Sequence, residues 1–291
     1  MSIIVQKFGG TSVSSPEKIK AVAKFIHQRL SHEDRIVVVV SAMGQATNNL
    51  IALAKNVSQD PPKRELDMLI SCGERTSMAL LAMALCDLGV KAQSLTGSQS
   101  GIITDDQHSN AEITSIMPSR VIEALSTHQV VIIAGFQGVS SKKEITTLKR
   151  GGSDTTAVAM AAALKARVCE IYTDVEGIFD ADPRLVKNAQ SLPTISCEDL
   201  ESMALYGAKV MAHDAASLAR EFGIEILVAK TGTVLGTLVQ NAPVTPKKPV
   251  KALTHLRGVV RFTHETSTPF KNLQGYFLCG FKRGSQMVGY S

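Results

Sequence analysis

Short runs of apolar, β-branched residues alternate along the chain with segments whose apolar positions recur at helical spacing. Each run predicts a strand, and an unbroken run such as 36–40 indicates a strand buried on both faces of a sheet. The predicted strands are residues 3–8, 35–40, 130–134, 168–173 and 225–229, and the predicted helices after the first are 48–57, 65–88, 153–166, 197–203 and 208–222. Strands that alternate with helices predict a mostly parallel sheet with helices on both sides.

The first helix has the clearest boundary in the sequence. Ser14 and Glu17 form an S-x-x-E capping pattern, and Pro16 between them fits the first helical turn. The apolar residues that follow share one helical face and are Ile19, Val22, Ala23, Ile26 and Leu30. At the end of the 65–88 segment, Gly89 is typical of a residue that terminates a helix.

The 291 residues are enough for about two domains. Residues 241–249 hold three prolines and two lysines, which predicts a linker. We therefore expect one α/β domain over residues 1–240 and a short C-terminal unit over 250–291, in which 250–263 looks strand-like. About forty residues are few for an independent fold, so this unit is expected to need the main domain or a partner chain.

The net charge of +5 is concentrated near the C-terminus. Residues 245–291 hold eight of the 31 Lys and Arg residues and one of the 26 acidic residues, so the preceding part of the chain is slightly acidic. With no Trp and 4% aromatic residues, that part also offers few surfaces on which bases could stack. Nucleic acid is therefore not an expected partner of the main domain.

The sequence also limits the compartment. Its longest apolar runs are far shorter than the roughly 20 residues of a membrane-spanning helix, and its N-terminus lacks the pattern of a signal peptide. The five cysteines are widely spaced and form no CxxC pair, which argues against a disulfide framework or a zinc knuckle. These features predict a cytoplasmic protein with reduced thiols and no membrane partner.

The strongest local signal is the segment Lys7-Phe8-Gly9-Gly10-Thr11-Ser12, which follows a predicted strand and precedes a capped helix. Glycines at such a place let backbone N–H groups approach an anion, and the lysine adds a mobile positive charge. The segment therefore predicts a phosphate site, although a glycine pair after a strand is equally compatible with a simple tight turn. Its spacing matches neither the P-loop nor the GxGxxG dinucleotide motif.

A second glycine-rich segment, 149–156, opens the predicted helix 153–166. Ser153 is a natural N-cap, and Asp154 in the first turn suits the helix dipole, so its simplest interpretation is that of a capping acid. That interpretation leaves Arg150 unexplained, and arginine is well suited to bind a carboxylate or a phosphate in a bidentate manner. Two anion-directed loops on one sheet indicate two anionic substrates.

The order of several motifs resembles that of the aspartokinases, members of the amino-acid kinase superfamily. The segments that carry the resemblance are 5–13, 40–44, 71–74, 94–97, 134–138, 147–156, 172–177, 181–184, 206–210 and 236–239. They follow the family order over about residues 3–240. The resemblance implies a three-layer αβα sandwich around a mostly parallel sheet of about eight strands.

The resemblance also implies a reaction, the transfer of the ATP γ-phosphate to the side chain of L-aspartate to give 4-phospho-L-aspartate. The acceptor is a carboxylate with an ordinary pKa of ~3.9, so no general base is required. The residues need only align the reactants and neutralise phosphoryl charge, with Mg²⁺ as cofactor. The implied setting is a cytoplasmic homo-oligomer at the head of lysine, threonine and methionine biosynthesis.

The resemblance assigns site residues by position. Lys7 and Asp154 are implied as catalytic residues, with Asp154 orienting the Lys7 side chain. The residues implied to bind aspartate are Ser41, Thr47, Glu74, Arg150 and Ser153, with Arg150 on its α-carboxylate and Glu74 on its ammonium group. The residues implied to bind the nucleotide are Lys7, Gly9, Gly10, Thr11, Ser12, Thr173, Asp174, Phe179, Arg184 and Lys209. No protein ligand of a metal is implied.

Three departures from the family pattern stand out. Lys149 replaces a usual glycine, so a crowded loop or a positive φ is expected there. Phe179 and Asp180 replace a usual Tyr-Thr pair, which removes a hydroxyl near the nucleotide. Residues 211–214, Met-Ala-His-Asp, replace a usual Leu-His-Pro-Arg and reverse a charge. His213 is displaced by one position from the family histidine and is interpreted as structural.

Two alternatives stay open at this point. One is a related kinase with another acceptor, such as glutamate, carbamate or UMP. The other is an inactive, nucleotide-binding homologue that acts as a regulatory or assembly partner. Residues 250–291 correspond to only a fragment of the paired ACT modules usual in the family, so we also expect no ordinary feedback control by lysine or threonine.

Overall fold

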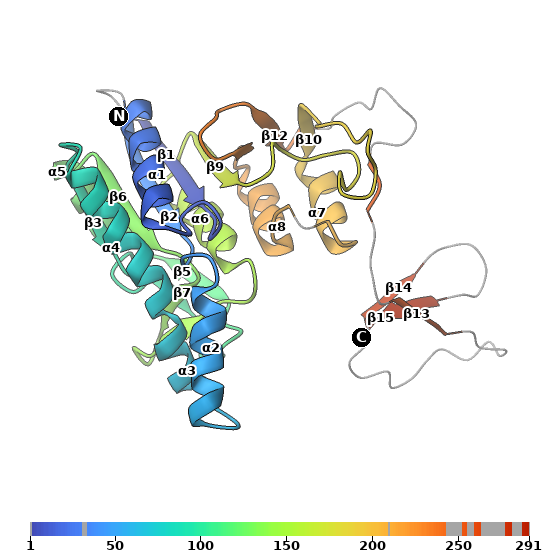
Figure 1. The fold of residues 1–291 in the computed structure, drawn as a ribbon, viewed down its shortest axis with the longest axis horizontal. Coiled ribbons are helices and arrows are strands. Elements are labelled where there is room, and N and C mark those ends of the chain that lie inside the picture. The colour runs from blue at the N-terminus through green and yellow to red at the C-terminus, as the bar shows by residue number, and fades with distance from the viewer. Residues whose placement is uncertain are drawn as a thin grey trace.

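An eight-stranded, mostly parallel sheet forms the middle layer of the computed structural model (Figure 1), which describes residues 2–30, 34–208, 210–242, 252–254, 259–262, 277–280 and 287–290. The strand order is β10-β12-β11-β9-β1-β2-β6-β3, and only β11 and β12 pair antiparallel. The strands of this sheet are β1 (Ser2–Phe8), β2 (Asp34–Val40), β3 (Ala92–Leu95), β6 (Val130–Ala134), β9 (Val168–Thr173), β10 (Thr194–Ser196), β11 (Ile226–Lys230) and β12 (Gly236–Gln240).

Helices cover both faces of this sheet, so the predicted three-layer αβα architecture is confirmed. The helices are α1 (Pro16–Arg29), α2 (Ala46–Val57), α3 (Lys63–Ile70), α4 (Cys72–Cys86), α5 (Ser119–Thr127), α6 (Gly152–Ala163), α7 (Cys197–Leu205) and α8 (His213–Phe222). One core contains residues of α1 and α4, and the other contains residues of α5, α6, α7 and α8.

Strand β2 shows why the central strands are continuously apolar. Ile36, Val38 and Val40 belong to the core beneath α1 and α4, whereas Val37 and Val39 belong to the opposite core. Because successive side chains of a strand point to opposite faces, a strand between two helical layers needs an apolar residue at every position.

A smaller four-stranded sheet lies beside the end of β6 and has the order β5-β4-β7-β8. Its strands are β4 (Ile102–Thr104), β5 (Ile113–Ile116), β7 (Gln137–Ser140) and β8 (Ile145–Thr147). Strands β7 and β8 form an antiparallel hairpin that leaves the end of β6 and leads back to the start of α6. None of these strands was predicted, because they are short and mix polar with apolar residues.

The C-terminal region contains a three-stranded antiparallel sheet of the order β13-β15-β14, formed by β13 (Val259–Phe262), β14 (Phe277–Gly280) and β15 (Met287–Tyr290). Strand β13 falls within the segment 250–263 that looked strand-like. The predicted linker 241–249 lies outside the described residues except for Asn241 and Ala242. The division into residues 1–240 and 250–291 stays a prediction.

Several predicted helix boundaries are wrong. The N-cap of α1 is Ser15, whose side chain accepts a hydrogen bond from the Lys18 backbone, because the hydroxyl of Ser14 donates to the Thr11 carbonyl instead. The helix predicted over 208–222 begins only at His213.

The predicted 65–88 helix is divided at Ser71 into α3 and α4. Taken together, Lys63–Cys86 has the length and apolar character of a membrane span. Its apolar residues Met78, Leu81 and Leu85 are nevertheless buried in the core beside α1, which is the environment of an internal helix. Gly89 follows with φ +78°, as expected of a glycine that terminates a helix.

Candidate active site

The candidate site lies where the parallel strands β9, β1, β2 and β6 reach their carboxyl ends. Ligands of open α/β sheets characteristically bind at this edge. The loops that leave these strands carry the glycine-rich segment 9–12, the segment 41–44 and the start of the β7–β8 excursion. They also include Asp174, directly after β9. The topology therefore brings segments that are far apart in the sequence to one edge of the sheet.

An ion pair joins the two glycine-rich loops. Lys7 is on β1 two residues after Val5, so its side chain points to the same face, which α6 covers. Its Nζ lies 2.7 Å from Oδ1 of Asp154 in the first turn of α6, and both side chains are only 11–12% exposed. The predicted partnership between Lys7 and Asp154 is therefore present in the geometry.

At position 10, the first loop fits its surroundings only with glycine. A Cβ on Gly10 would lie 2.8 Å from the Ala42 carbonyl oxygen, which is closer than carbon and oxygen atoms approach. The backbone of Gly44 also donates a hydrogen bond of 3.0 Å to the Gly10 carbonyl, and the Ser41 backbone donates to Phe8. The loop is thus held against segment 41–44 by its main chain, which goes beyond the simple tight turn considered as an alternative.

Glu74 is a buried carboxylate at the beginning of α4 and is 3% exposed. Its Oε1 accepts a hydrogen bond of 3.1 Å from the Ala42 backbone, whereas its Oε2 has no hydrogen-bond partner among the described residues. Burial raises the pKa of Glu74 to about 7. A half-satisfied carboxylate of this kind is a strong acceptor for a cationic ligand group.

The residues around Glu74 converge on the same place. The Ala42 residue whose N–H binds Glu74 also supplies the carbonyl that Gly10 approaches, so the carboxylate and the first loop flank one peptide segment. A Cβ on Gly73 would lie 2.8 Å from the Ala42 side chain and 3.7 Å from Oγ1 of Thr47. The structure therefore brings together Glu74 and Thr47 of the predicted aspartate pocket beside the first glycine-rich loop, with Ser41 adjacent to Ala42.

The second glycine-rich loop differs in detail from its prediction. The N-cap of α6 is Gly151, which has φ +79°, and Ser153 lies inside the first turn. A Cβ on Gly135 would lie 2.8 Å from Oγ of Ser153, so the buried Ser153 packs at the end of β6. Arg150 is exposed at the mouth of this loop.

The crowding expected at Lys149 is not observed. Lys149 is exposed, does not occur among the non-glycine residues with positive φ, and forms an ion pair with Glu112 on the loop before β5. The hydrogen bond that Lys149 donates to Glu112 raises the pKa of Lys149, and the charge of Asp214 adds to this effect. Gly151 supplies the left-handed conformation that the turn needs, which leaves Lys149 free to project outward.

The residues predicted to bind the nucleotide fall into two groups in the structure, one beside the first loop and one in the long loop after β9. Thr173 ends β9 beside the first loop, since the Gly9 backbone donates to the carbonyl of Tyr172 at 3.3 Å, and Asp174 accepts from the Thr173 hydroxyl at 3.0 Å. Arg184 belongs to the long loop after β9 and pairs with Asp182 at 2.9 Å.

The remaining predictions near the nucleotide concern Phe179, Lys209 and His213. In the same long loop, Phe179 is half-buried and bridges to Ser191. Lys209 lies outside the described residues. His213 begins α8, where its ring nitrogens are 3.6–3.7 Å from Asp214 and Glu201, which fits the structural interpretation.

One contact at the site was not predicted from the sequence. The hydroxyls of Ser12 and Thr231 lie 2.7 Å apart, and Thr231 also donates from its backbone and hydroxyl to the Thr173 carbonyl. Thr231 therefore ties the first loop to the end of β9. Its only sequence signal is that it directly follows a strand, β11, that ends at the same edge.

The donor set offers little to a free metal ion. In the part of the chain that the structure describes, no group of three or more His, Cys, Asp or Glu side chains could hold one. Mg²⁺ in nucleotide-dependent enzymes is commonly held by substrate phosphates with one or two carboxylates.

Curated relatives of the chain include proteins named aspartokinase. The aspartokinase of Mycolicibacterium smegmatis is 51% identical over 249 residues, which are 84% of this chain and 59% of that protein. The chain thus spans about three fifths of the length of this curated relative.

Solved structures agree with this relationship. An aspartate kinase from Synechocystis is 46% identical with a TM-score of 0.74 and covers 86% of this chain, which corresponds to 41% of that protein. Aspartokinase III from E. coli in complex with aspartate and ADP is 28% identical with a TM-score of 0.78 and covers 89% of this chain and 68% of its own. The sequence model of the amino acid kinase family matches residues 2–230, and the chain therefore belongs to that family.

Proposed function

We propose that the chain transfers the γ-phosphoryl group of ATP to the side-chain carboxylate of L-aspartate, giving 4-phospho-L-aspartate and ADP. The observation that carries this proposal is the half-satisfied carboxylate of Glu74 beside the loop joined to Asp154 through Lys7. An amino acid needs one anionic and one cationic partner, and Glu74 and Arg150 supply these charges. The relatives named aspartokinase favour aspartate over glutamate, carbamate or UMP.

Charge placement explains how these residues act. An aspartate carboxylate oxygen attacks the γ-phosphorus as the bond to the bridging oxygen breaks, and the bond's electron pair leaves with ADP. The Lys7 ammonium and the N–H groups of residues 9–12 stabilise the charge on the transferring group. Asp154 keeps the flexible Lys7 side chain in place before ATP arrives.

The acceptor is held by the other half of the site. Arg150 binds the α-carboxylate and Glu74 binds the ammonium group, while Ser41, Thr47 and Ser153 line the pocket. Because the nucleophile is already ionised at neutral pH, no residue has to remove a proton from it. This agrees with a site whose charged groups serve to bind and orient.

The nucleotide lies along the end of β9. Thr173 and Asp174 are next to the first loop, and Phe179, Arg184 and Lys209 extend the proposed path. Mg²⁺, held mainly by the ATP phosphates, supplies additional charge neutralisation when bound. By its relatives we place the reaction at the start of lysine, threonine and methionine biosynthesis, in a cytoplasmic homo-oligomer.

The test compares acceptors under one detection method. ADP release by the purified chain is measured with ATP, Mg²⁺ and L-aspartate, L-glutamate, carbamate or UMP, and hydroxylamine trapping identifies an acyl phosphate. Aspartate-dependent ADP release with hydroxamate formation supports the proposal. Turnover with a different acceptor, or ATP binding without any product, contradicts it.

A further inference from the structure

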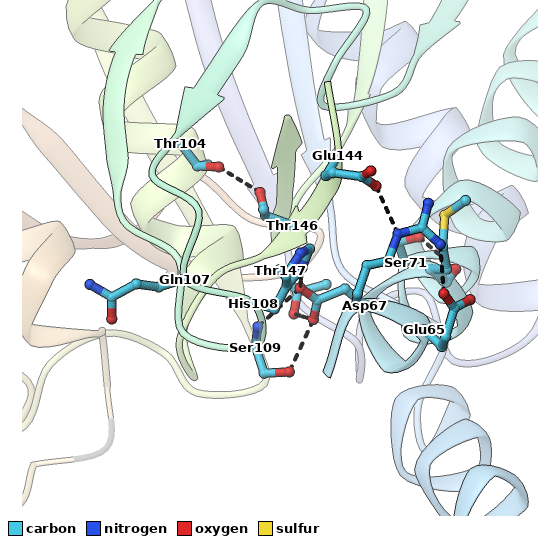
Figure 2. Close-up of polar contacts among 12 residues, drawn as sticks. Glu65, Asp67, Ser71, Thr104, Gln107, His108, Ser109, Glu144, Thr146 and Thr147 are labelled. Atoms are coloured by element: carbon cyan, nitrogen blue, oxygen red, sulfur yellow. Dashed lines mark hydrogen bonds and ion pairs between the residues drawn. The ribbon is translucent and has the colours of Figure 1, made fainter. Parts of the chain in front are cut away.

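A second buried carboxylate lies outside the proposed site. Asp67 on α3 is fully buried, and four donors surround it (Figure 2). Its Oδ2 accepts from Nδ1 of His108 at 2.8 Å and from the Ser109 backbone at 3.0 Å, and its Oδ1 accepts from the hydroxyls of Ser109 at 3.1 Å and Thr147 at 2.5 Å. An ionised carboxylate has about four acceptor positions, so this one is saturated.

These bonds join three separate parts of the chain. Asp67 belongs to α3, His108 and Ser109 belong to the loop between β4 and β5, and Thr147 ends β8. Leaving a buried carboxylate without partners is costly, so the three segments are held in one arrangement while the cluster is intact. The proposed mechanism makes no use of this cluster.

Strand β7, beside β8, also contacts the junction between α3 and α4. Thr147 pairs in register with Gln137 on β7. The Gln137 amide donates at 2.8 Å to the carbonyl of Ser71, which separates α3 from α4, and its oxygen accepts from Arg75 at 3.3 Å. The cross-strand pair therefore holds the α3–α4 junction at two points, Asp67 and Ser71.

Both sides of this cluster lead directly into the acceptor pocket. Glu74 follows Ser71 within the first turn of α4, and Arg150 follows Thr147 by three residues. We propose that Asp67 is a positioning residue that sets the separation of Glu74 and Arg150. This inference rests on the proposed function, because it assigns both residues to one bound aspartate.

The proposal predicts a selective kinetic effect. Loosening the cluster should raise KM for aspartate, whose two charged ends depend on this separation. It should leave KM for ATP nearly unchanged, because Lys7 and the first loop are held by the ion pair to Asp154 and by segment 41–44. Small displacements of positioning groups commonly cost about tenfold or more, so we expect a rise in KM for aspartate of about tenfold.

The experiment uses near-isosteric changes in the full chain. Thr147→Val removes the hydroxyl from which Asp67 accepts a hydrogen bond, and Thr147→Ser retains that hydroxyl. Asp67→Asn removes the charge without changing the volume. Arg64→Ala is the matched control, since Arg64 also links α3 to the β7–β8 hairpin through Glu144 at 2.9 Å, but both side chains are exposed.

We expect Thr147→Val and Asp67→Asn to raise KM for aspartate with KM for ATP retained, and Thr147→Ser and Arg64→Ala to resemble the unchanged chain. Hydrogen exchange gives a readout independent of activity. Amides of 71–74 and 147–152 should exchange faster in Thr147→Val, whereas those of 9–12 should not.

Unchanged KM for aspartate in folded Thr147→Val and Asp67→Asn, or a parallel rise in KM for ATP, overturns the inference. Unchanged exchange in 71–74 and 147–152 overturns it as well, even if the chain proves inactive. An unmodified chain that does not phosphorylate aspartate counts against the proposed function and leaves the exchange comparison as the decisive test.

Discussion

The two proposed halves of the site differ in how their charged side chains are paired. We call the half with Lys7 and Asp154 the phosphate side and the half with Glu74 and Arg150 the acceptor side. On the phosphate side, Lys7 and Asp154 form an ion pair at 2.7 Å before any ligand binds. On the proposed acceptor side, Glu74 has a buried oxygen with no hydrogen-bond partner among the described residues, and Arg150 is exposed. We expect Lys7, held by its ion pair, to act on the charge that develops in the transition state, and the half-satisfied Glu74 to bind a charge that the ligand already carries in its ground state. The first side should therefore control kcat and the second KM.

The largest effect is expected on the phosphate side. Lys7→Ala removes the cation proposed to face the transferring phosphoryl group and should lower kcat by about 10³-fold, the size expected for loss of one major electrostatic stabiliser. Steady-state rates with ATP and aspartate give this value. Circular dichroism checks that the variant is folded.

Lys18→Ala is the matched control, because Lys18 is an exposed lysine that donates to the same loop at the Thr11 carbonyl, at 2.9 Å. Its kcat should stay within a few-fold of the original. Near-normal turnover by Lys7→Ala would show that the glycine-rich loop does not hold the phosphoryl group.

The second largest effect is expected at Arg150. Arg150→Ala should raise KM for aspartate by about ten- to a hundredfold, as expected for loss of a charge-assisted hydrogen bond of about 1.5–3 kcal/mol, with a much smaller change in kcat. Initial rates over a range of aspartate concentrations separate the two parameters. Lys149→Ala, which removes the adjacent lysine bound to Glu112, should change neither parameter much. A loss confined to kcat would move Arg150 to the phosphate side.

The main layers of the fold were predictable, and the reason is visible in β6 and β9. Their observed bounds match the predicted 130–134 and 168–173, because their apolar runs reflect burial in the middle layer. Strands β7 and β8 could not be found in this way. Gln137–Ser140 and Ile145–Thr147 contain mostly short or polar side chains and become strands through pairing with each other and with β4.

The site was predictable in part. Lys7 and Asp154 stood out because glycine-rich loops at strand ends mark them, and the structure joins them. Asp67 carries a weaker signal, an acid three residues before Ile70 on the buried side of a short helix, and it is not among the predicted site residues. The different states of Asp67 and Glu74 depend on which donors from distant segments reach each carboxylate, and no local pattern encodes that.

A pH dependence should distinguish the acceptor side further. The pKa of Glu74 is raised to about 7, and only its ionised form binds an ammonium group well. Lowering the pH from 8 to 6 should therefore raise KM for aspartate by about tenfold, since the ionised fraction falls by about that factor. Glu74→Gln should show a high KM for aspartate that stays nearly constant between pH 8 and pH 6. A pH profile shared by both proteins would assign the titration to another group.

The smallest effect is on stability and has the opposite sign to the effect on function. Because the pKa of Glu74 rises from 4.5 in the unfolded chain to about 7 in the folded chain, the folded state holds the proton more tightly, and its stability falls as the pH rises from 4.5 to 7. The full loss corresponds to about 3 kcal/mol at 1.36 kcal/mol per pKa unit. Glu74→Gln removes this buried charge and should stabilise the protein by about 1–3 kcal/mol at pH 8 but hardly at all at pH 4, below the unfolded pKa. Urea unfolding at the two pH values measures the difference. An equal change in stability at both pH values, or a loss of stability at pH 8, would mean that burial of the ionised Glu74 carboxylate does not destabilise the folded protein. The contrast between the two sides of the site would then not hold.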